Sequence, residues 1–177
     1  MSRLLRFTYP EVPRNPDNEH IINAEIVASS SDLKAGQAID RVGVMLSLNF
    51  PAGPELERLS EKSNAVFKIK PSMKNADCSL SGVENKCKKM LTENYEKSDI
   101  ALFCIDSVIA ALDGMYKALM PKYGALPVVF SGGVTSNKRI KNYFHDKYNA
   151  IFAEPAFSAD NAAGTAVLSS IMYDRRK

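Results

Sequence analysis

The residues with the clearest chemical potential lie in the run 131–137, Ser-Gly-Gly-Val-Thr-Ser-Asn, which follows a short apolar stretch and precedes a helix-like one. A glycine pair lets backbone amides approach a ligand closely, and a helix N-terminus offers N–H groups and partial positive charge to an anion. Gly132, Gly133 and Asn137 are therefore candidate phosphate-contacting residues. The same run also suits a tight strand-to-helix turn with Asn137 as an ordinary cap, and the residues alone leave both interpretations open. It matches neither a Walker loop nor a dinucleotide-binding fingerprint.

Three further candidates gain interest from their expected neighbours. Asp160 opens the last helix-like run, where aspartate is commonly just an N-cap. Loops that follow successive parallel strands gather at one sheet edge, so 155–161 is expected to meet 131–137 in one crevice. Asp40 lies inside an apolar-rich helical run, where its carboxylate either accepts hydrogen bonds from a ribose or faces water. Gly53, between two prolines, marks a rigid bend where backbone could touch a ligand.

Other chemistries find no support in the sequence. His20 and His145 form no H-x-x-x-H or H-E-x-x-H pattern, and no G-x-S-x-G elbow is present. Cys78, Cys87 and Cys104 are odd in number, and their spacing suits neither a disulfide framework nor a metal knuckle, which favours reduced thiols. A self-contained metal site and a serine hydrolase are both disfavoured.

Size and composition predict one soluble domain. The chain has 177 residues, of which 45% are hydrophobic and 24% charged, with a net charge of +3. No apolar run reaches the roughly 18 residues that span a bilayer, and the N-terminus lacks the apolar core of a secretory signal. We expect a cytoplasmic protein with no membrane association.

Patterning predicts an α/β order of elements that would position these residues. The alternation argues for a parallel or mixed sheet with helices packed on it. The expected elements, from turn signals and apolar spacing, are a hairpin of 4–8 and 21–28, a helix capped by Ser31-Asp32 and running to about 48, a short helix 55–62, a strand-like alternation 65–70, a helix from 81–82 to about 95, a helix capped by Ser98 and stopped by Pro121 and Gly124, a strand 126–130, a helix 137–147, a strand 150–153 and a helix 160–173.

Five motifs in order resemble the carboxy-terminal half of the TsaD/Gcp family, the tRNA threonylcarbamoyladenosine transferases formerly described as O-sialoglycoprotein endopeptidases. Residues 31–41 are similar to the family's D-D-A-A-G-E-A-F-D-K, and 51–54 follow at the spacing of its P-G-G-P. Residues 79–82 resemble S-F-S-G, 131–137 resemble A-G-G-V-x-x-N, and 157–161 resemble F-C-T-D-N. Together they cover about 30–170.

This resemblance implies one lobe of an actin-like, sugar-kinase-like (ASKHA, ribonuclease H-like) ATPase fold, with 1–177 as a single C-terminal lobe whose N-terminal lobe is absent. It implies that Asp40 binds the ribose of ATP or threonylcarbamoyl-adenylate, that Gly53 and Asn137 also contact it, and that Asp160 ligates iron or zinc. The family's other metal ligands are two histidines on the missing lobe. It further implies as partners that lobe, a homodimer mate or a TsaB-like protein, and tRNA.

Departures from the family pattern keep two functions open. Gln37 replaces a glutamate, Ala52 a glycine and Glu84 a lysine, and the last change reverses charge near an anionic ligand, which weakens phosphate binding unless compensated. The first hypothesis is a lobe of a threonylcarbamoyl transferase, inactive alone. The second is a non-catalytic paralogue or partner protein of the same fold that acts through dimerisation.

Overall fold

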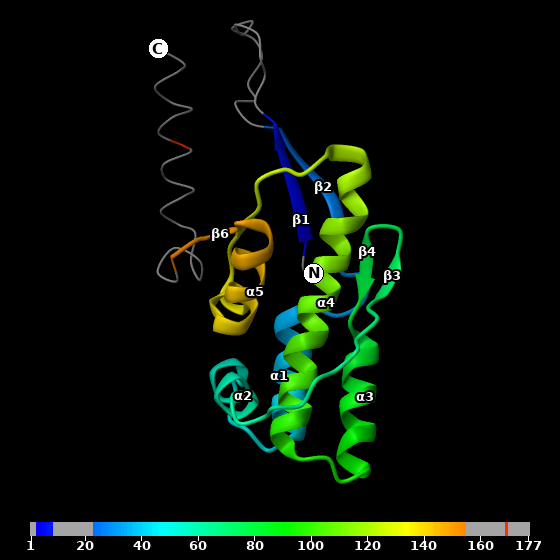
Figure 1. Cartoon of the computed structure of the whole chain (residues 1–177), viewed down its shortest axis with the longest axis vertical. Helices are drawn as coiled ribbons and strands as arrows, with labels where there is room; N and C mark the ends of the chain where they lie inside the picture. The colour runs from blue at the N-terminus through cyan, green and yellow to red at the C-terminus, as the bar shows by residue number, and fades with distance from the viewer. Residues whose placement is uncertain (1–2, 9–22, 155–168, 170–177) are drawn as a thin grey trace, which may run out of the picture.

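The computed structural model describes residues 3–8, 23–154 and 169, and the expected helix 160–173 with its Asp160 lies outside the described residues. Helices α1, α2 and α3 lie in the lower part of Figure 1, α4 rises past them to the level of β2, and the strand pairs and α5 lie above and beside the lower helices. The elements are β1 (Arg3–Thr8), β2 (Asn23–Ser29), α1 (Ala35–Met45), α2 (Gly53–Ser60), β3 (Ser72–Lys74), β4 (Asp77–Ser79), α3 (Ser81–Thr92), α4 (Lys97–Tyr123), β5 (Val129–Phe130), the 3-10 turn η1 (Gly133–Ser136), α5 (Lys138–Tyr148) and β6 (Ile151–Phe152).

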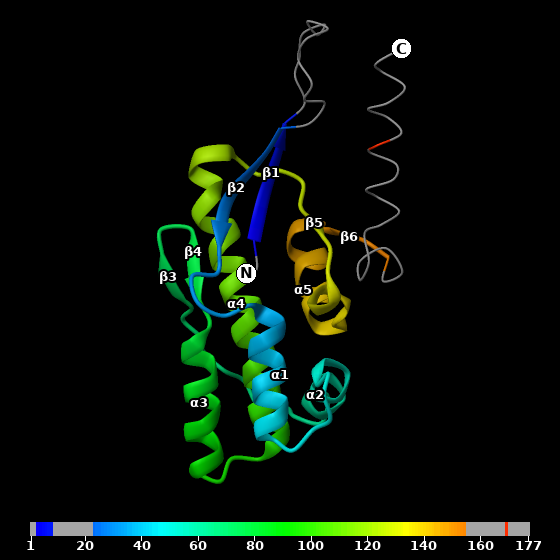
Figure 2. The same ribbon diagram turned by 180° about the vertical axis from the view of Figure 1, so that it is seen from behind.

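Helix α4 is the central element of the core. It is the longest helix, and α1, α2, α3 and α5 all contact it, as Figures 1 and 2 show from opposite sides. The apolar stripe predicted from the sequence is confirmed, since Ile100, Cys104, Val108 and Met115 are all fully buried. The three cysteines are buried and unpaired, and no described helix is long and apolar enough to cross a membrane.

The strands form separate pairs in the described residues. The expected N-terminal hairpin is confirmed as the antiparallel pair β1–β2, with a register shift between Leu4 and Leu5. Strands β3 and β4 form a second antiparallel pair, and β5 and β6 a parallel one. The α/β character is confirmed, whereas the single mixed sheet that the alternation suggested is not seen among the described strands.

The prediction that Ser31-Asp32 caps the first helix is wrong. Helix α1 begins after Lys34, whose backbone N–H donates to the Gln37 side chain (3.2 Å). Asp32 instead lies at the start of α3, where its carboxylate accepts hydrogen bonds from the backbone N–H groups of Leu80 (2.9 Å) and Ser81 (3.2 Å). Burial opposes ionisation, but the hydrogen bonds from the 79–81 turn outweigh it and hold the Asp32 pKa well below its usual range. A long-range cap of this kind leaves no local sequence signal.

Other elements also differ from expectation, among them α1, which ends at Met45, and β5, which covers only Val129–Phe130. Helix α4 begins at Lys97 after Glu96, so Ser98 is not its cap, and Pro121 lies inside its last turn, which ends before Gly124. Residues 65–70 are extended but pair with no strand, and the β3–β4 hairpin comes after them. The paired strands are those on either side of the Asn75-Ala76 turn, and the alternating residues 65–70 are not among them.

Candidate functional site

Asp40 and the proline-flanked bend are joined by a direct hydrogen bond. The backbone N–H of Ala52 donates to Asp40 Oδ1 (2.9 Å), which fixes the start of α2 and Gly53 beside the middle of α1. Helices α1 and α2 approach closely here because α1 carries Gly43, where an added Cβ would overlap the Cβ of Ala52. Two motifs that are separate in the sequence thus occupy one place.

The turn from Gly132 to Ser136 lies against the first turn of α1. An ideal Cβ added to Gly36 would lie 3.4 Å from Val134 Cγ2. Gly132 has φ +108°, a conformation that residues with a side chain rarely adopt, whereas Gly133 begins a 3-10 turn without positive φ. The Thr135 hydroxyl closes the turn by donating to the Gly132 carbonyl (2.7 Å).

Two glycines of this region are not explained by local packing. An added Cβ at Gly53 or Gly133 would meet no described atom within 4 Å, and neither has positive φ. Their neighbourhoods therefore have room for another group. We call Asp40, Ala52, Gly53, Gly132 and Gly133 the glycine junction.

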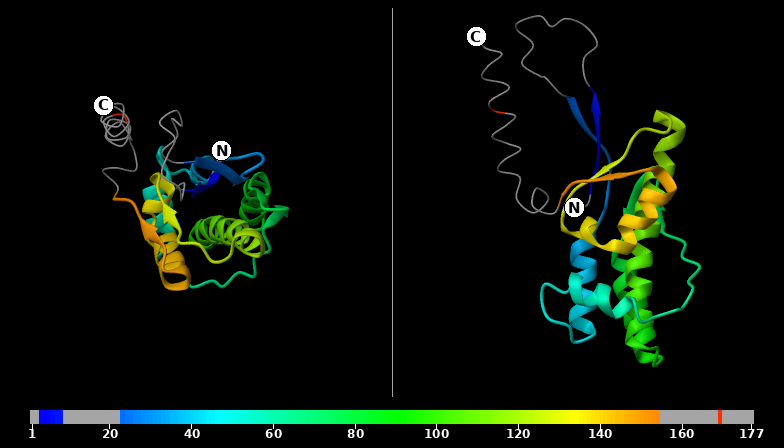
Figure 3. Two further views of the ribbon diagram at one scale, coloured as in Figure 1. Left: turned by 90° about the horizontal axis from the view of Figure 1, so that it is seen from above. Right: turned by 60° about the vertical axis from the view of Figure 1, so that its left-hand side comes forward.

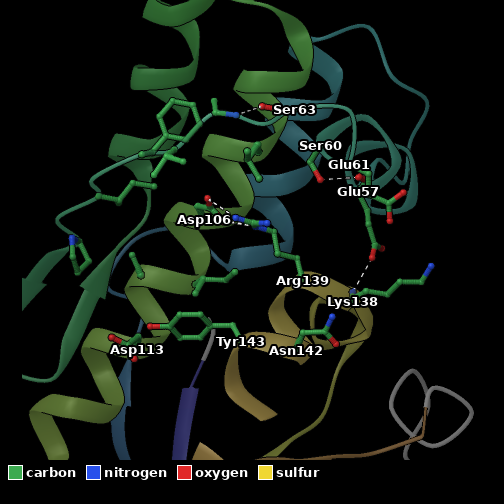
Figure 4. Close-up of a pocket in the computed structure, with 18 of the residues that line it drawn as sticks. Glu57, Ser60, Glu61, Ser63, Asp106, Asp113, Lys138, Arg139, Asn142 and Tyr143 are labelled. Carbon is green, nitrogen blue, oxygen red and sulfur yellow. Dashed lines mark hydrogen bonds and ion pairs between the residues drawn. The ribbon is translucent and has the colours of Figure 1, made fainter. Parts of the chain in front are cut away.

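Two of the first three N–H groups of α5 are already hydrogen-bonded, which limits the unpaired N–H groups expected there. Buried Asn137 caps it through Oδ1, which accepts from Ile140 N–H (3.1 Å), so the capping interpretation is confirmed. The N–H of Lys138 donates to Glu57 Oε1 on α2 (2.7 Å), a contact drawn in Figure 4. An anion at the turn would therefore meet Gly132–Gly133 and the Asn137 Nδ2 rather than the first N–H of α5.

The residues that depart from the family pattern have identifiable structural roles. Gln37 accepts the N–H of Lys34, a hydrogen bond that glutamate also makes at this position of a helix. Glu84, at the start of α3, pairs with Arg41 on α1 (Nη1 to Oε2, 3.0 Å). Arg41 therefore balances the negative charge of Glu84 between α1 and α3, one residue along the helix from Asp40.

A metal centre is not assembled by the described part of the chain. No three His, Cys, Asp or Glu side chains come together there, and His145 is exposed beside Asp146. Asp160, the one expected ligand, lies outside the described residues, as does His20. The described residues therefore do not fit an iron or zinc ion, and no reaction step is assigned to one.

A groove that the sequence did not reveal lies between α2, the extended segment 64–71, α4 and α5. Its volume is about 1040 Å³, and Figure 4 shows Glu57, Asp106 and Arg139 around it. Arg139 binds Asp106 through two contacts, Nε to Oδ1 (2.6 Å) and Nη2 to Oδ2 (3.1 Å). The partners are 33 residues apart, so no local pattern could have indicated the pair.

The groove ends at a dense charge network. Asp113 is buried and accepts from Lys147 Nζ (3.0 Å) and Tyr148 Oη (2.5 Å), and it also pairs with Lys117 (2.7 Å). Burial opposes ionisation of Asp113, but these partners outweigh it and lower its pKa to about 2. Burial and the neighbouring carboxylate raise the pKa of Tyr148 to about 12. We call these four residues, with Tyr143 as second partner of Lys147, the Asp113 cluster.

Fold and site together define a mixed α/β domain in which the 51–53 bend and the 132–136 turn both lie against helix α1. The model of the TsaD family, tRNA N6-adenosine threonylcarbamoyltransferase, matches residues 18–167. The chain belongs to this family. Relatives with that name include proteins of Kosmotoga olearia, 28% identical over 88% of this chain, and Buchnera aphidicola, 33% identical over 84% of it. The chain spans about half the length of these relatives, 49% and 48% respectively.

Proposed function

We propose that residues 1–177 form the C-terminal, nucleotide-facing lobe of a TsaD-type threonylcarbamoyl transferase with an actin-like, ribonuclease H-like ATPase fold. The ligand is ATP or threonylcarbamoyl-adenylate, and tRNA is the acceptor. Asp40 contacts the ribose, while Gly53, Gly132, Gly133 and Asn137 surround the rest of the ligand. Asp160 supplies one metal ligand. Family membership supports the reaction class. The geometry of the glycine junction supports the choice of Asp40, Gly53, Gly132 and Gly133 as ligand-contacting residues.

The observation that carries the proposal is the open space at Gly53 and Gly133. Both stand at the first residue of a helical turn, where neither φ nor packing gives a reason for glycine. Close approach of a ligand is such a reason. The two glycines belong to different motifs, yet both lie at turns that contact α1.

The chemistry of this lobe is binding and orientation. The Asp40 carboxylate has a second oxygen besides the one that accepts Ala52 N–H, and a carboxylate is a suitable acceptor for ribose hydroxyls. Backbone amides at the glycines donate to phosphate oxygens. Because this lobe provides only one side of the proposed nucleotide site, the chain alone is expected to bind ATP weakly and to have no transferase activity.

Calorimetric titration tests this proposal. ATP is titrated into the chain alone and into a fusion that adds the amino-terminal half of the Kosmotoga olearia relative. We expect tighter binding by the fusion, loss of that gain in Gly53→Ala and Gly133→Ala, and unchanged unfolding midpoints in both variants. Equal binding by the variants and the parent would refute the glycine contacts, and turnover by the chain alone would refute its dependence on a second lobe.

One observation favours the alternative, a non-catalytic paralogue that acts by dimerisation or with a TsaB-like partner. Val129 and Ile151 are opposite each other in the β5–β6 pair and are 65% and 61% exposed. Paired apolar side chains on a parallel pair are normally covered. Sedimentation of the chain alone distinguishes the two functions: a dimer dispersed by Val129→Lys, with no ATP binding by the fusion, supports the alternative.

A further inference from the structure

The extended segment 64–71 has the side-chain pattern of a β-strand without a strand partner. Its side chains alternate in exposure: Ala65, Phe67 and Ile69 are half-buried, while the intervening Val66 and Lys68 are exposed. Val66 is 92% exposed. The inward side is anchored, because the Phe67 ring packs edge-on against Phe103 of α4 at 5.3 Å. The alternation predicted from the sequence is therefore real, although no ladder forms.

The main-chain groups of this segment are available for pairing. Among the described residues, the only hydrogen bond from its backbone is that of Ala65 N–H to Ser63 Oγ (3.1 Å), and residues 66–71 have none. Unpaired N–H and C=O groups on an extended backbone are a template for another strand. The segment crosses α4 in Figure 1 and stands clear of the helices in the right-hand view of Figure 3.

The groove runs along this segment and gives an added strand a floor. Its α4 side is formed by residues at helical spacing, namely Leu102, Asp106, Ile109, Ala110, Asp113 and Gly114. Ala110 is small and Leu102 and Ile109 are apolar, so apolar side chains of a strand can face them, whereas Gly114 is already covered by Met73 and Pro71. The carboxylates of the floor are already paired with Arg139, Lys117 and Lys147.

Charge selects the kind of strand that fits. Segment 64–71 carries Lys68 and Lys70 and no aspartate or glutamate, while Glu57 and Glu61 line the groove on the α2 side. Lys68 and Lys70 point outward on the exposed side. A second copy of the segment would place lysines opposite lysines, which is destabilising, whereas opposite charges across a strand pair attract.

We propose that segment 64–71 binds an extended acidic segment of a partner protein by strand addition. The partner strand lies in the groove, hydrogen-bonds to residues 66–70, directs apolar side chains to α4 and places carboxylates opposite Lys68 and Lys70. The proposal is independent of nucleotide binding at the glycine junction.

Hydrogen exchange with a designed peptide tests it. The probe is a peptide of about nine residues in which Asp and Val alternate, longer than the typical strand of about five to six residues. With the 177-residue chain, we expect slowed exchange of alternate amides in 66–70. Controls are a peptide of the same composition with its Asp and Val residues in separate blocks, and the alternating peptide N-methylated at alternate residues.

Charge variants and an RNA competitor complete the test. By fluorescence anisotropy, Lys68→Glu should weaken peptide binding about three- to tenfold, while Lys68→Arg and the exposed helix variant Lys88→Glu leave it unchanged. The proposal is overturned if no peptide protects the segment at about millimolar concentration, if the block peptide protects it equally, or if a short single-stranded RNA protects the same amides. The last result would assign the lysines to a polyanion surface instead.

Discussion

The glycine junction and the Asp113 cluster use polar groups in opposite ways. In the cluster, Asp113 has three cationic or hydroxyl partners within 3.0 Å, and its pKa is depressed by them. In the junction, Asp40 holds one backbone N–H, and the adjacent glycines have free space beside them. A strongly perturbed pKa is often taken to mark a functional site. Here the lowered pKa of Asp113 is explained by its three partners, whereas the space that no side chain fills lies at the glycine junction.

Close packing of α1 on α2 supports the junction, and breaking it is expected to have the largest effect. Gly43→Ala places a methyl group where the Ala52 side chain lies, so the helices must separate. We expect a loss of about 3 kcal/mol in the free energy of unfolding, at the upper end for overpacked cores. Urea denaturation measures it, with Gly36→Ala as control, whose added Cβ has ordinary contact with Val134. Equal stability of the two variants would show that the Gly43 contact is unimportant.

Removing the charge of Asp113 tests whether the cluster is structural. A carboxylate whose pKa falls from about 3.9 unfolded to about 2 folded stabilises the protein by about 2 kcal/mol above pH 4. That contribution is lost as the pH falls from about 4 to 2, because the folded state must then bind the proton. Asp113→Asn should therefore be about 2 kcal/mol less stable at pH 7 and show a flatter acid unfolding profile.

The matched control for this variant is Asp146→Asn, which alters an exposed carboxylate on α5. Thermal unfolding from pH 7 to pH 2 compares the two. A profile for Asp113→Asn that runs parallel to the parent would contradict the role of the cluster in acid stability.

The two glycines of the turn offer a comparison within the junction. Gly132→Ala forces a side chain into φ +108° and should cost about 1 to 2 kcal/mol. Gly133→Ala should change stability by less than about 0.5 kcal/mol, because no described atom is near and its φ is permitted. Chemical denaturation of both variants measures the difference. Similar losses would mean that Gly133 is also required by the fold, and the argument for a ligand there would fail.

Local sequence signals predict the helices and strands, whereas the hydrogen-bond partners of individual side chains depend on contacts between distant parts of the chain. The stripe on α4 and the Asn137 cap depend on neighbours a few residues away, and the β1–β2 hairpin is marked by two β-prone runs on either side of a turn-rich sequence, so each was predictable. The role of Asp32 depends on residues 79–81, and that of Glu57 on Lys138, both far along the chain. No periodicity in a single sequence records such pairs.

The alternation at 65–70 shows a different limit. The alternation predicts a strand, and the structure confirms its inward and outward sides but not its pairing. Side-chain pattern reports which face is buried, whereas a ladder also needs a second backbone at the right distance. The candidate site residues Asp40, Gly53, Gly132, Gly133 and Asn137 follow from local chemistry and from motif resemblance, and their ligand contacts stay predictions.

The smallest expected effect concerns the ion pair between Arg41 and Glu84. Both side chains are partly exposed, so separating them should cost only about 0.2 to 1 kcal/mol. Glu84→Lys brings two cations together between α1 and α3, which lowers stability slightly, and the added positive charge should make the junction more attractive to a nucleotide phosphate. The charge-swapped double variant, Arg41→Glu with Glu84→Lys, restores the pair without changing net charge.

If Arg41 offsets Glu84 at the junction, the fusion protein should bind ATP more tightly in Glu84→Lys and about as tightly as the parent in the double variant. Unchanged affinity in Glu84→Lys would show that this pair lies too far from the ligand to influence it, and would remove charge as an objection to nucleotide binding.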